Sequence, residues 1–205
     1  MNFVYAFGWL IVRIVTKIFF RIKVYNKEFV PKEGGFLLAS NHISYYDPPV
    51  LGTWTPRIVY FLGKEELLNS PIKKWFFGKM HTMPVKRGAM DRRAIQSCID
   101  RVKEGHGMII FPEGTRSKTD DFLPGKAGIG LIAKKANCDI VPVYIHGFNK
   151  LKDVFFGKDK LTITFGEKIP ASWVEAQTSD KNGYVVISQH VMGEIAKLKE
   201  NQFAG

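Results

Sequence analysis

Two residues carry the clearest chemical signal in the chain, namely His42 and Asp47 within the run NHISYYDP at 41–48. A histidine is the usual side chain for taking a proton from a hydroxyl group near neutral pH. A neighbouring carboxylate can fix the tautomer of that histidine and stabilise its protonated ring. The pair therefore indicates proton abstraction from a substrate hydroxyl.

The chain must turn between these two residues if their side chains are to meet. On one regular helix, positions 42 and 47 would point about 140° apart. A strand-to-helix turn through Ser44 would join them, with Asp47 as N-cap and Pro48 and Pro49 in the first helical turn. Two simpler interpretations remain open, a purely capping Asp47 and a buried, hydrogen-bonded His42. The other histidines have no comparable neighbours and are predicted to be structural: His81, His106, His146 and His190.

A second motif, FPEGTRS at 111–117, brings an acid and an arginine into a tight turn. Gly114 permits a turn that exposes backbone N–H groups, and the planar guanidinium of Arg116 matches phosphate oxygens. Glu113 could accept a hydrogen bond from a hydroxyl group or hold Arg116 in place. The alternative is an ordinary strand-end turn with a surface ion pair. Taken with the first motif, this one indicates a hydroxyl substrate that also bears a phosphate.

The composition points to one domain with an anionic partner. A chain of 205 residues can bury a substantial core without staples. The net charge of +11 fits nucleic acid, an acidic membrane surface, an acidic carrier protein or a phosphorylated metabolite. The two cysteines, Cys98 and Cys138, show no ligand spacing, which argues against a disulfide scaffold or a zinc site.

The N-terminal segment has the pattern of a helix that lies in a membrane interface. Residues 1–12 are uncharged and include Trp9, and then Arg13, Lys17 and Arg21 follow at four-residue spacing. The apolar run is shorter than the 18 or so residues of a spanning helix. A cationic stripe beside apolar faces is typical of an interfacial helix. The alternative is a helix packed on the core of the domain.

A second basic and aromatic segment, KKWFFGK at 73–79, contains Trp75 and Phe76. Such interleaving could stack nucleic-acid bases, line an acyl groove or rest on lipid headgroups. A solvated basic face is the default interpretation. We predict that Trp75 and Phe76 contact the membrane together with Trp9 and the cations at 13, 17 and 21.

The order of the remaining elements predicts an α/β fold. Strands are expected at 21–25, 36–39, 58–62, 107–111, 140–145 and 161–165, and helices after residue 47 and at 91–104, 126–135 and 180–200. This alternation predicts a layered sandwich with a mixed, largely parallel central sheet flanked by helices. Both motifs follow strands, and ligands bind beyond the carboxyl ends of parallel strands. We expect a membrane-interface helix at 1–20 and one catalytic domain at 21–205.

Over about residues 34–166 the chain resembles the 1-acylglycerol-3-phosphate (lysophosphatidic acid) acyltransferases of the glycerolipid acyltransferase superfamily. The His-x4-Asp motif is catalytic in that family, which implies this role for His42 and Asp47. The third family block, FPEGTRS, is matched in full and implies acceptor binding by Glu113, Gly114 and Arg116. Thr115 is predicted to lie in the same acceptor site.

Two further family blocks are matched. A Pro-Val-x-Arg-Gly block at 84–88 implies phosphate binding by Arg87, and Lys86 is predicted to assist. A Val-Pro-Val strand at 141–143 contains Pro142, which we predict to line an acyl or acceptor pocket with Asn41 and Ser44. One departure is the histidine at 81, where many relatives carry glycine.

The resemblance implies transfer of a fatty acyl group from acyl-CoA or acyl-carrier protein to the free hydroxyl of 1-acylglycerol 3-phosphate, giving phosphatidic acid. No nucleophile elbow or cysteine with triad-like surroundings is evident, so a covalent acyl-enzyme is not expected. Neither a metal nor a nucleic-acid partner is expected, and the predicted location is the cytoplasmic face of the cell membrane, as a peripheral or monotopic protein. The same chemistry on glycerol 3-phosphate or another lysophospholipid is the alternative. A non-catalytic basic lipid- or nucleic-acid-binding module would leave the His–Asp spacing unexplained.

Overall fold

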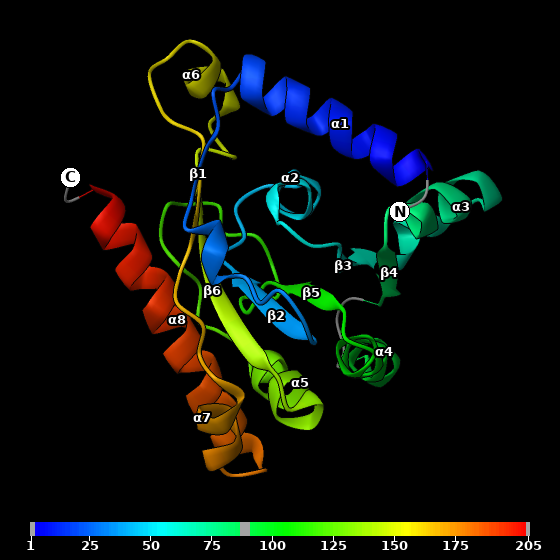
Figure 1. Cartoon of the computed structure of the whole chain (residues 1–205), viewed down its shortest axis with the longest axis vertical. Helices are drawn as coiled ribbons and strands as arrows, with labels where there is room; N and C mark the ends of the chain where they lie inside the picture. Colours follow the sequence, from blue (N-terminus) through cyan, green and yellow to red (C-terminus); the bar gives the residue numbers. More distant parts are fainter. Residues whose placement is uncertain (1–2, 87–90, 204–205) are drawn as a thin grey trace.

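A seven-stranded sheet forms the centre of the molecule, with strand order β1-β7-β6-β2-β5-β3-β4 (Figure 1). The structure is a computed structural model that describes residues 3–86 and 91–203. The strands are β1 Lys23–Tyr25, β2 Phe36–Ser40, β3 Val59–Lys64, β4 Thr82–Val85, β5 Gly107–Ile110, β6 Asp139–His146 and β7 Thr162–Phe165. Every neighbouring pair is parallel except β6 and β7, which are antiparallel.

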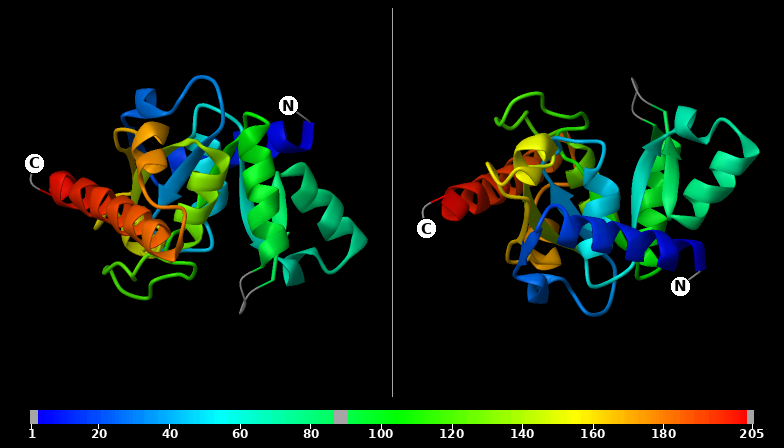
Figure 2. Two further views of the ribbon diagram at one scale, coloured as in Figure 1. Left: turned by 90° about the horizontal axis from the view of Figure 1, so that it is seen from below. Right: turned by 90° about the horizontal axis from the view of Figure 1, so that it is seen from above.

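Helices cover both faces of this sheet. They are α1 Phe3–Ile18, α2 Asp47–Trp54, α3 Pro71–Lys79, α4 Arg92–Lys103, α5 Gly128–Ala136, α6 Leu151–Phe155, α7 Ala171–Ala176 and α8 Lys181–Phe203. Two short 3-10 helices, η1 Lys27–Phe29 and η2 Glu65–Leu68, lie in connections. Figure 2 shows α4, α5 and α8 in front in the view from below, and α1 crossing the molecule in the view from above.

The central strands are apolar on both faces, as expected for parallel strands buried between helices. In β2, Leu37 and Ala39 belong to the core under α4, α5, α7 and α8. Phe36 and Leu38 point the other way, into the core shared with α2 and α6. All five residues of β2 are buried. Strand β2 is therefore held on both faces, and the residues after Ser40 lie at the carboxyl end of this central strand.

The predicted fold class is confirmed: a mixed, mostly parallel sheet is flanked by helices, and an N-terminal helix is present. The predicted strands and long helices are found with ends shifted by a few residues. Four short elements were not predicted from the sequence, namely α3, α6, α7 and β4. Periodicity is weak over such lengths, and α3 in addition has no buried residue in the described structure.

Helix α1 lies against α2 with its polar side inward. The guanidinium of Arg13 sits 3.6 Å from the ring centroid of Trp9 and donates to the carbonyl of Thr53 at 3.3 Å. Thr16 is buried and accepts a hydrogen bond from the indole of Trp54 at 3.0 Å. Arg13, which was predicted to face outward, and the buried Thr16 therefore attach this helix to the domain.

The other side of α1 and the turn after it is exposed and apolar. It carries Phe3, Phe7, Leu10, Ile11, Ile14, Val15, Ile18 and Phe19. The prediction of one outward cationic stripe is wrong, because Arg13 faces α2 and Arg21 lies beyond the last helical residue with φ of +48°. Lys17 remains exposed on the helix. Among the described residues, no helix has the length and apolarity needed to cross a membrane.

Candidate active site

The first motif begins where β2 is tied to β6. The side-chain amide of Asn41 donates to the carbonyl of Ile145 at 3.0 Å, and its oxygen accepts from the N–H of the same residue at 2.8 Å. Both ends of this buried amide are thus used to extend the pairing of β2 with β6. Asn41 fixes the start of the loop that carries His42, and it also lines a small pocket with Ile43.

The chain then turns back so that His42 and Asp47 meet. Nδ1 of His42 lies 2.8 Å from Oδ2 of Asp47. The same oxygen accepts from the N–H groups of Ile43 and Ser44, both at 2.7 Å. The hydroxyl of Ser44 accepts from the N–H of Tyr46 at 3.3 Å and so belongs to the turn itself. The predicted strand-to-helix turn is therefore present.

The predicted N-cap role of Asp47 is wrong. Tyr46 is the N-cap residue, and Asp47 is the first residue of α2. A capping side chain accepts from the second or third helical N–H group. Pro48 and Pro49 have no N–H, and the N–H of Val50 donates to the carbonyl of Tyr46. The carboxylate of Asp47 turns instead toward the loop that precedes it.

This geometry sets up His42 as a base. An ionised carboxylate only accepts hydrogen bonds, so the Nδ1 facing Asp47 carries the proton and Nε2 keeps its lone pair. In the described parts of the chain, Nε2 has no hydrogen-bond partner. Burial raises the pKa of Asp47, which is 0% exposed, and the hydrogen bonds from His42, Ser44 and Ile43 oppose that shift. The imidazole stacks on the ring of Phe111 with centroids 4.0 Å apart.

The second motif wraps around the same histidine. Glu113 accepts from the N–H of His42 at 2.8 Å through Oε1 and from the N–H of Leu123 at 2.9 Å through Oε2. Ser117 donates its N–H to the carbonyl of His42 at 2.7 Å. Burial raises the pKa of Glu113, and the two backbone hydrogen bonds oppose the shift. The structure therefore brings the two motifs into direct contact.

The exposed part of this turn presents cationic groups. Gly114 has φ of +67°, in the left-handed region that favours glycine, and it is exposed together with Thr115. A methyl group placed on Gly114 would lie 3.0 Å from Nζ of Lys126. The guanidinium of Arg116 lies over the ring of Tyr45, with Cζ 3.4 Å from its centroid. Three of the residues predicted to bind an acceptor thus share one turn, in which Gly114 and Thr115 are exposed and Arg116 is half-buried.

The remaining predicted acceptor and pocket residues belong to other segments of the chain. Lys86 is exposed, with Nζ 3.9 Å from Oε2 of Glu65 in a surface hollow beside η2. Arg87 lies outside the described residues. Pro142 is inside β6 in register with Ala39, and its Cγ would lie 3.0 Å from a methyl group placed on Gly166. Its place in a pocket with Asn41 and Ser44 stays a prediction.

Three contacts were missed by the sequence analysis. Tyr45 stacks under Arg116, Phe111 stacks on His42, and Lys126 approaches Gly114. Tyr45 and Phe111 lie inside the motifs, so their positions were a usable signal. Lys126 belongs to neither motif, and only the folding of the loop brings it close.

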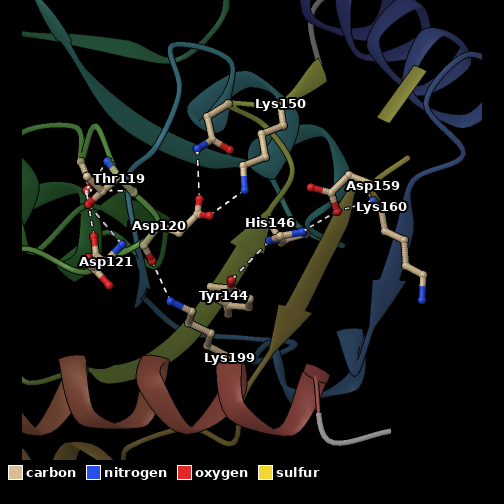
Figure 3. A network of polar contacts seen from close by, with 11 residues as sticks. Thr119, Asp120, Asp121, Tyr144, His146, Lys150, Asp159, Lys160 and Lys199 are labelled. Atoms are coloured by element: carbon tan, nitrogen blue, oxygen red, sulfur yellow. Dashed lines mark hydrogen bonds and ion pairs between the residues drawn. The ribbon is translucent and has the colours of Figure 1, made fainter. Parts of the chain in front are cut away.

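A second histidine–aspartate pair lies near the end of β6 (Figure 3). Nε2 of His146 is 2.8 Å from Oδ1 of Asp159, so the prediction that His146 lacks such a neighbour is wrong. Its Nδ1 lies 3.5 Å from the hydroxyl of Tyr144. Both ring nitrogens are engaged, unlike those of His42, and this favours a structural role for His146.

His81 shows how the chain accommodates its departure from the family pattern. Its φ of +59° lies in the left-handed region that favours glycine. The ring packs edge-on against Tyr5 of α1 and Tyr60 of β3, with centroids 4.6 and 4.8 Å away. The histidine side chain thus connects α1 to the sheet. Within residues 3–86 and 91–203, no group of three or more His, Cys, Asp or Glu side chains could hold a metal ion.

Comparison with known proteins identifies the family of this chain. A family profile described as Acyltransferase matches residues 21–146, which include both motifs. The chain belongs to the acyltransferase family. This acyltransferase also resembles the 1-acyl-sn-glycerol-3-phosphate acyltransferase of Bacillus subtilis, with 34% identity over 152 residues that cover 72% of this chain and 73% of the relative.

Two other relatives and one solved structure are also similar to this chain. The Streptococcus pneumoniae 1-acyl-sn-glycerol-3-phosphate acyltransferase is 26% identical over 98% of this acyltransferase and 74% of the relative. The lyso-ornithine lipid O-acyltransferase of Pseudomonas aeruginosa is 28% identical over 77% of this chain and 61% of the relative. The crystal structure of the Thermotoga maritima 1-acyl-sn-glycerophosphate acyltransferase PlsC has a TM-score of 0.68 at 23% identity, covering 98% of this chain and 84% of that one, which supports the fold.

Proposed function

We propose that this acyltransferase moves a fatty acyl group from an acyl thioester, either acyl-CoA or acyl-carrier protein, to the free hydroxyl of 1-acylglycerol 3-phosphate. The product is phosphatidic acid. The observation that carries the proposal is the contact of Asp47 with Nδ1 of His42, which leaves Nε2 available to a hydroxyl group. Relatives from Bacillus subtilis and Streptococcus pneumoniae bear the name of this activity.

The proposed reaction is a direct transfer. Nε2 of His42 takes the hydroxyl proton while the hydroxyl oxygen attacks the carbonyl carbon of the thioester. The new C–O bond forms, the C–S bond breaks, and the departing thiolate takes the proton from the imidazolium. A free thiol has a pKa of about 8.5, so the thiolate leaves without much acid assistance. Asp47 stays ionised and stabilises the imidazolium through Oδ2.

The acceptor phosphate is proposed to bind at the exposed turn of the second motif. Arg116 supplies a planar fork for phosphate oxygens, and Tyr45 holds that fork flat. Gly114 and Thr115 are exposed beside it, and Lys126 adds a second positive charge. Lys86 and Arg87 remain a proposed contribution from the Pro-Val-x-Arg-Gly block. The proposal includes no metal, no other cofactor and no nucleic-acid partner.

The names of the relatives supply a second candidate for the acceptor. The Pseudomonas aeruginosa relative is named for a lyso-ornithine lipid, whereas the Bacillus subtilis relative is named for 1-acyl-sn-glycerol 3-phosphate. Glycerol 3-phosphate or another lysophospholipid is therefore the second candidate. The same base and the same thioester chemistry would serve each of them.

We further propose that the enzyme works as a peripheral or monotopic protein at the cytoplasmic face of the cell membrane. The apolar face of α1 supports this, because it exposes eight large side chains with the turn that follows it. Helix α3 exposes Ile72, Trp75 and Phe76 near the N-terminal end of α1 (Figure 1). The net charge of +11 favours an anionic surface.

The test crosses donors with acceptors. Purified protein is mixed with palmitoyl-CoA or palmitoyl-carrier protein and with lysophosphatidate, glycerol 3-phosphate, lysophosphatidylcholine or lyso-ornithine lipid. Free thiol is measured and the lipid product is identified by mass. Phosphatidate formed at the highest kcat/KM supports the proposal, and preferential acylation of another acceptor would replace lysophosphatidate. Absence of thiol release with every pair would contradict the proposed chemistry.

A further inference from the structure

Glu113 is buried behind the turn that carries His42 and does not face the solvent. Glu113 is only 1% exposed, whereas the neighbouring Gly114 and Thr115 are exposed. Oε1 accepts from the N–H of His42 at 2.8 Å, and Oε2 accepts from the N–H of Leu123 at 2.9 Å. Each carboxylate oxygen is therefore engaged by the backbone of a different loop.

The same motif holds His42 at two more points. The N–H of Ser117 donates to the His42 carbonyl at 2.7 Å, so both polar groups of this residue's backbone are bound by the second motif. The ring of Phe111 packs on the imidazole at an interplanar angle of 20°. Three residues of one short loop thus fix the backbone and the ring plane of the base.

We infer that Glu113 is a positioning residue for His42 and does not bind the acceptor. This inference rests on the proposed function, because it concerns the base of that reaction. It replaces the acceptor-binding role that the family resemblance implied for this residue.

Two physical arguments favour the positioning role. An acceptor that bears a phosphate would be repelled by a carboxylate placed against it, and this carboxylate has almost no surface to offer. A carboxylate is also suited to two converging N–H donors, because both of its oxygens accept and the bonds are charge-assisted. A glutamine would turn its NH₂ group toward one of these donors and leave it unsatisfied.

Kinetics of Glu113→Gln separate the two roles. Displacement of the base by a fraction of an ångström should lower kcat about tenfold or more, while the KM for lysophosphatidate stays within about twofold of wild type. Asp139→Asn is the matched control. Asp139 also accepts a backbone N–H, that of Ala171 at 2.8 Å, but it lies at the opposite end of β6, so kcat should be retained.

A raised KM with unchanged kcat in Glu113→Gln would overturn the inference and make Glu113 an acceptor ligand, while the proposed reaction would stand. An equal loss of kcat in Asp139→Asn would also overturn it, because general destabilisation would then account for the effect. Failure of the wild-type protein to acylate any acceptor would instead refute the proposed function.

A second measurement needs no variant and no turnover. Hydrogen exchange of the His42 amide is followed by NMR in the wild-type protein, with and without a saturating short-chain lysophosphatidate and no donor. A positioning role predicts that the amide stays protected when the acceptor binds. Loss of that protection would show that the carboxylate leaves His42 for the acceptor, and it would overturn the inference even if Glu113→Gln does not fold.

Discussion

The guanidinium of Arg116 lies flat over the ring of Tyr45, with Cζ 3.4 Å from the ring centroid. Tyr45 belongs to the first motif and Arg116 to the second, so this stack joins the base-carrying turn to the proposed phosphate site. A guanidinium on an aromatic face gains about 0.5–2 kcal/mol. The stack also holds the planar fork of Arg116 in one orientation, which lowers the entropy lost when phosphate binds.

Loss of the stack should weaken acceptor binding without removing the arginine. For Tyr45→Ala we expect the KM for lysophosphatidate to rise about 2- to 30-fold, as the quoted cation–π range implies, with a smaller change for the thioester. Tyr45→Phe is the control, because it keeps the ring and should stay near wild type. Steady-state kinetics with each substrate varied in turn would check this, and equal KM values for Ala and Phe would count against the stack.

Removal of Arg116 itself should also impair use of the acceptor. A hydrogen bond to a charged group contributes about 1.5–3 kcal/mol, so kcat/KM for lysophosphatidate should fall more than about tenfold in Arg116→Ala. Arg116→Lys should recover only part of the loss, since lysine cannot form the planar bidentate contact. An unchanged acceptor saturation curve in Arg116→Ala would assign this residue to the scaffold.

The membrane proposal assigns different effects to the two sides of α1. Ile14 and Ile18 are exposed, and each would contribute about 1.5–3 kcal/mol if fully buried in lipid. Ile14→Ser with Ile18→Ser should therefore reduce vesicle binding by more than about tenfold and leave the thermal midpoint unchanged. Arg13→Gln is the counterpart, because it should lower the thermal midpoint by weakening the attachment of α1 to α2.

Co-sedimentation with phosphatidylglycerol-containing vesicles and thermal melts would separate these effects. Binding should rise with anionic lipid and weaken with salt. Deletion of residues 1–20 should release the protein from vesicles. Undiminished co-sedimentation after that deletion would assign the membrane contact to another surface, such as the exposed aromatic side chains of α3.

The packing of His81 predicts a pH dependence of stability. Burial lowers the pKa of His81, and nearby positive groups at His106 and Arg101 lower it further. Below the unfolded pKa of about 6.5, the unfolded chain binds a proton at this residue more readily than the folded protein does. The free energy of unfolding should therefore decrease as the pH falls through and below this value.

His81→Asn should flatten that dependence, since asparagine tolerates the left-handed conformation and does not titrate. Denaturant unfolding of both proteins at several pH values between 5 and 8 would measure the difference. The same pH slope in wild type and variant would show that His81 does not contribute to it.

The sequence was sufficient to predict the fold class and the contact between His42 and Asp47. Long apolar strands and periodic helices are encoded locally, and the spacing of His42 and Asp47 allowed only a turn between them. The second motif was recognised, but the inward direction of Glu113 could not be read from it. That direction depends on the N–H of Leu123, which only the folded loop brings within reach.

The predicted orientation of the N-terminal helix was wrong for a related reason. Spacing placed Arg13, Lys17 and Arg21 on one stripe, but it could not say which side of the helix would meet the domain. Trp54 and the carbonyl of Thr53 attract the guanidinium of Arg13 inward. The helix was predicted correctly from the sequence, but contacts with α2 determine which of its sides faces the domain.

The central claim is that His42, oriented by Asp47, takes the proton from the acceptor hydroxyl. The most direct measurement is the single-turnover rate of acyl transfer from palmitoyl-CoA to lysophosphatidate by His42→Ala, with folding verified by circular dichroism and with Asp47→Asn in parallel. Loss of a general base predicts a rate about 10² to 10⁴ lower in His42→Ala, and severe impairment in Asp47→Asn. A wild-type rate in well-folded His42→Ala protein would contradict the account.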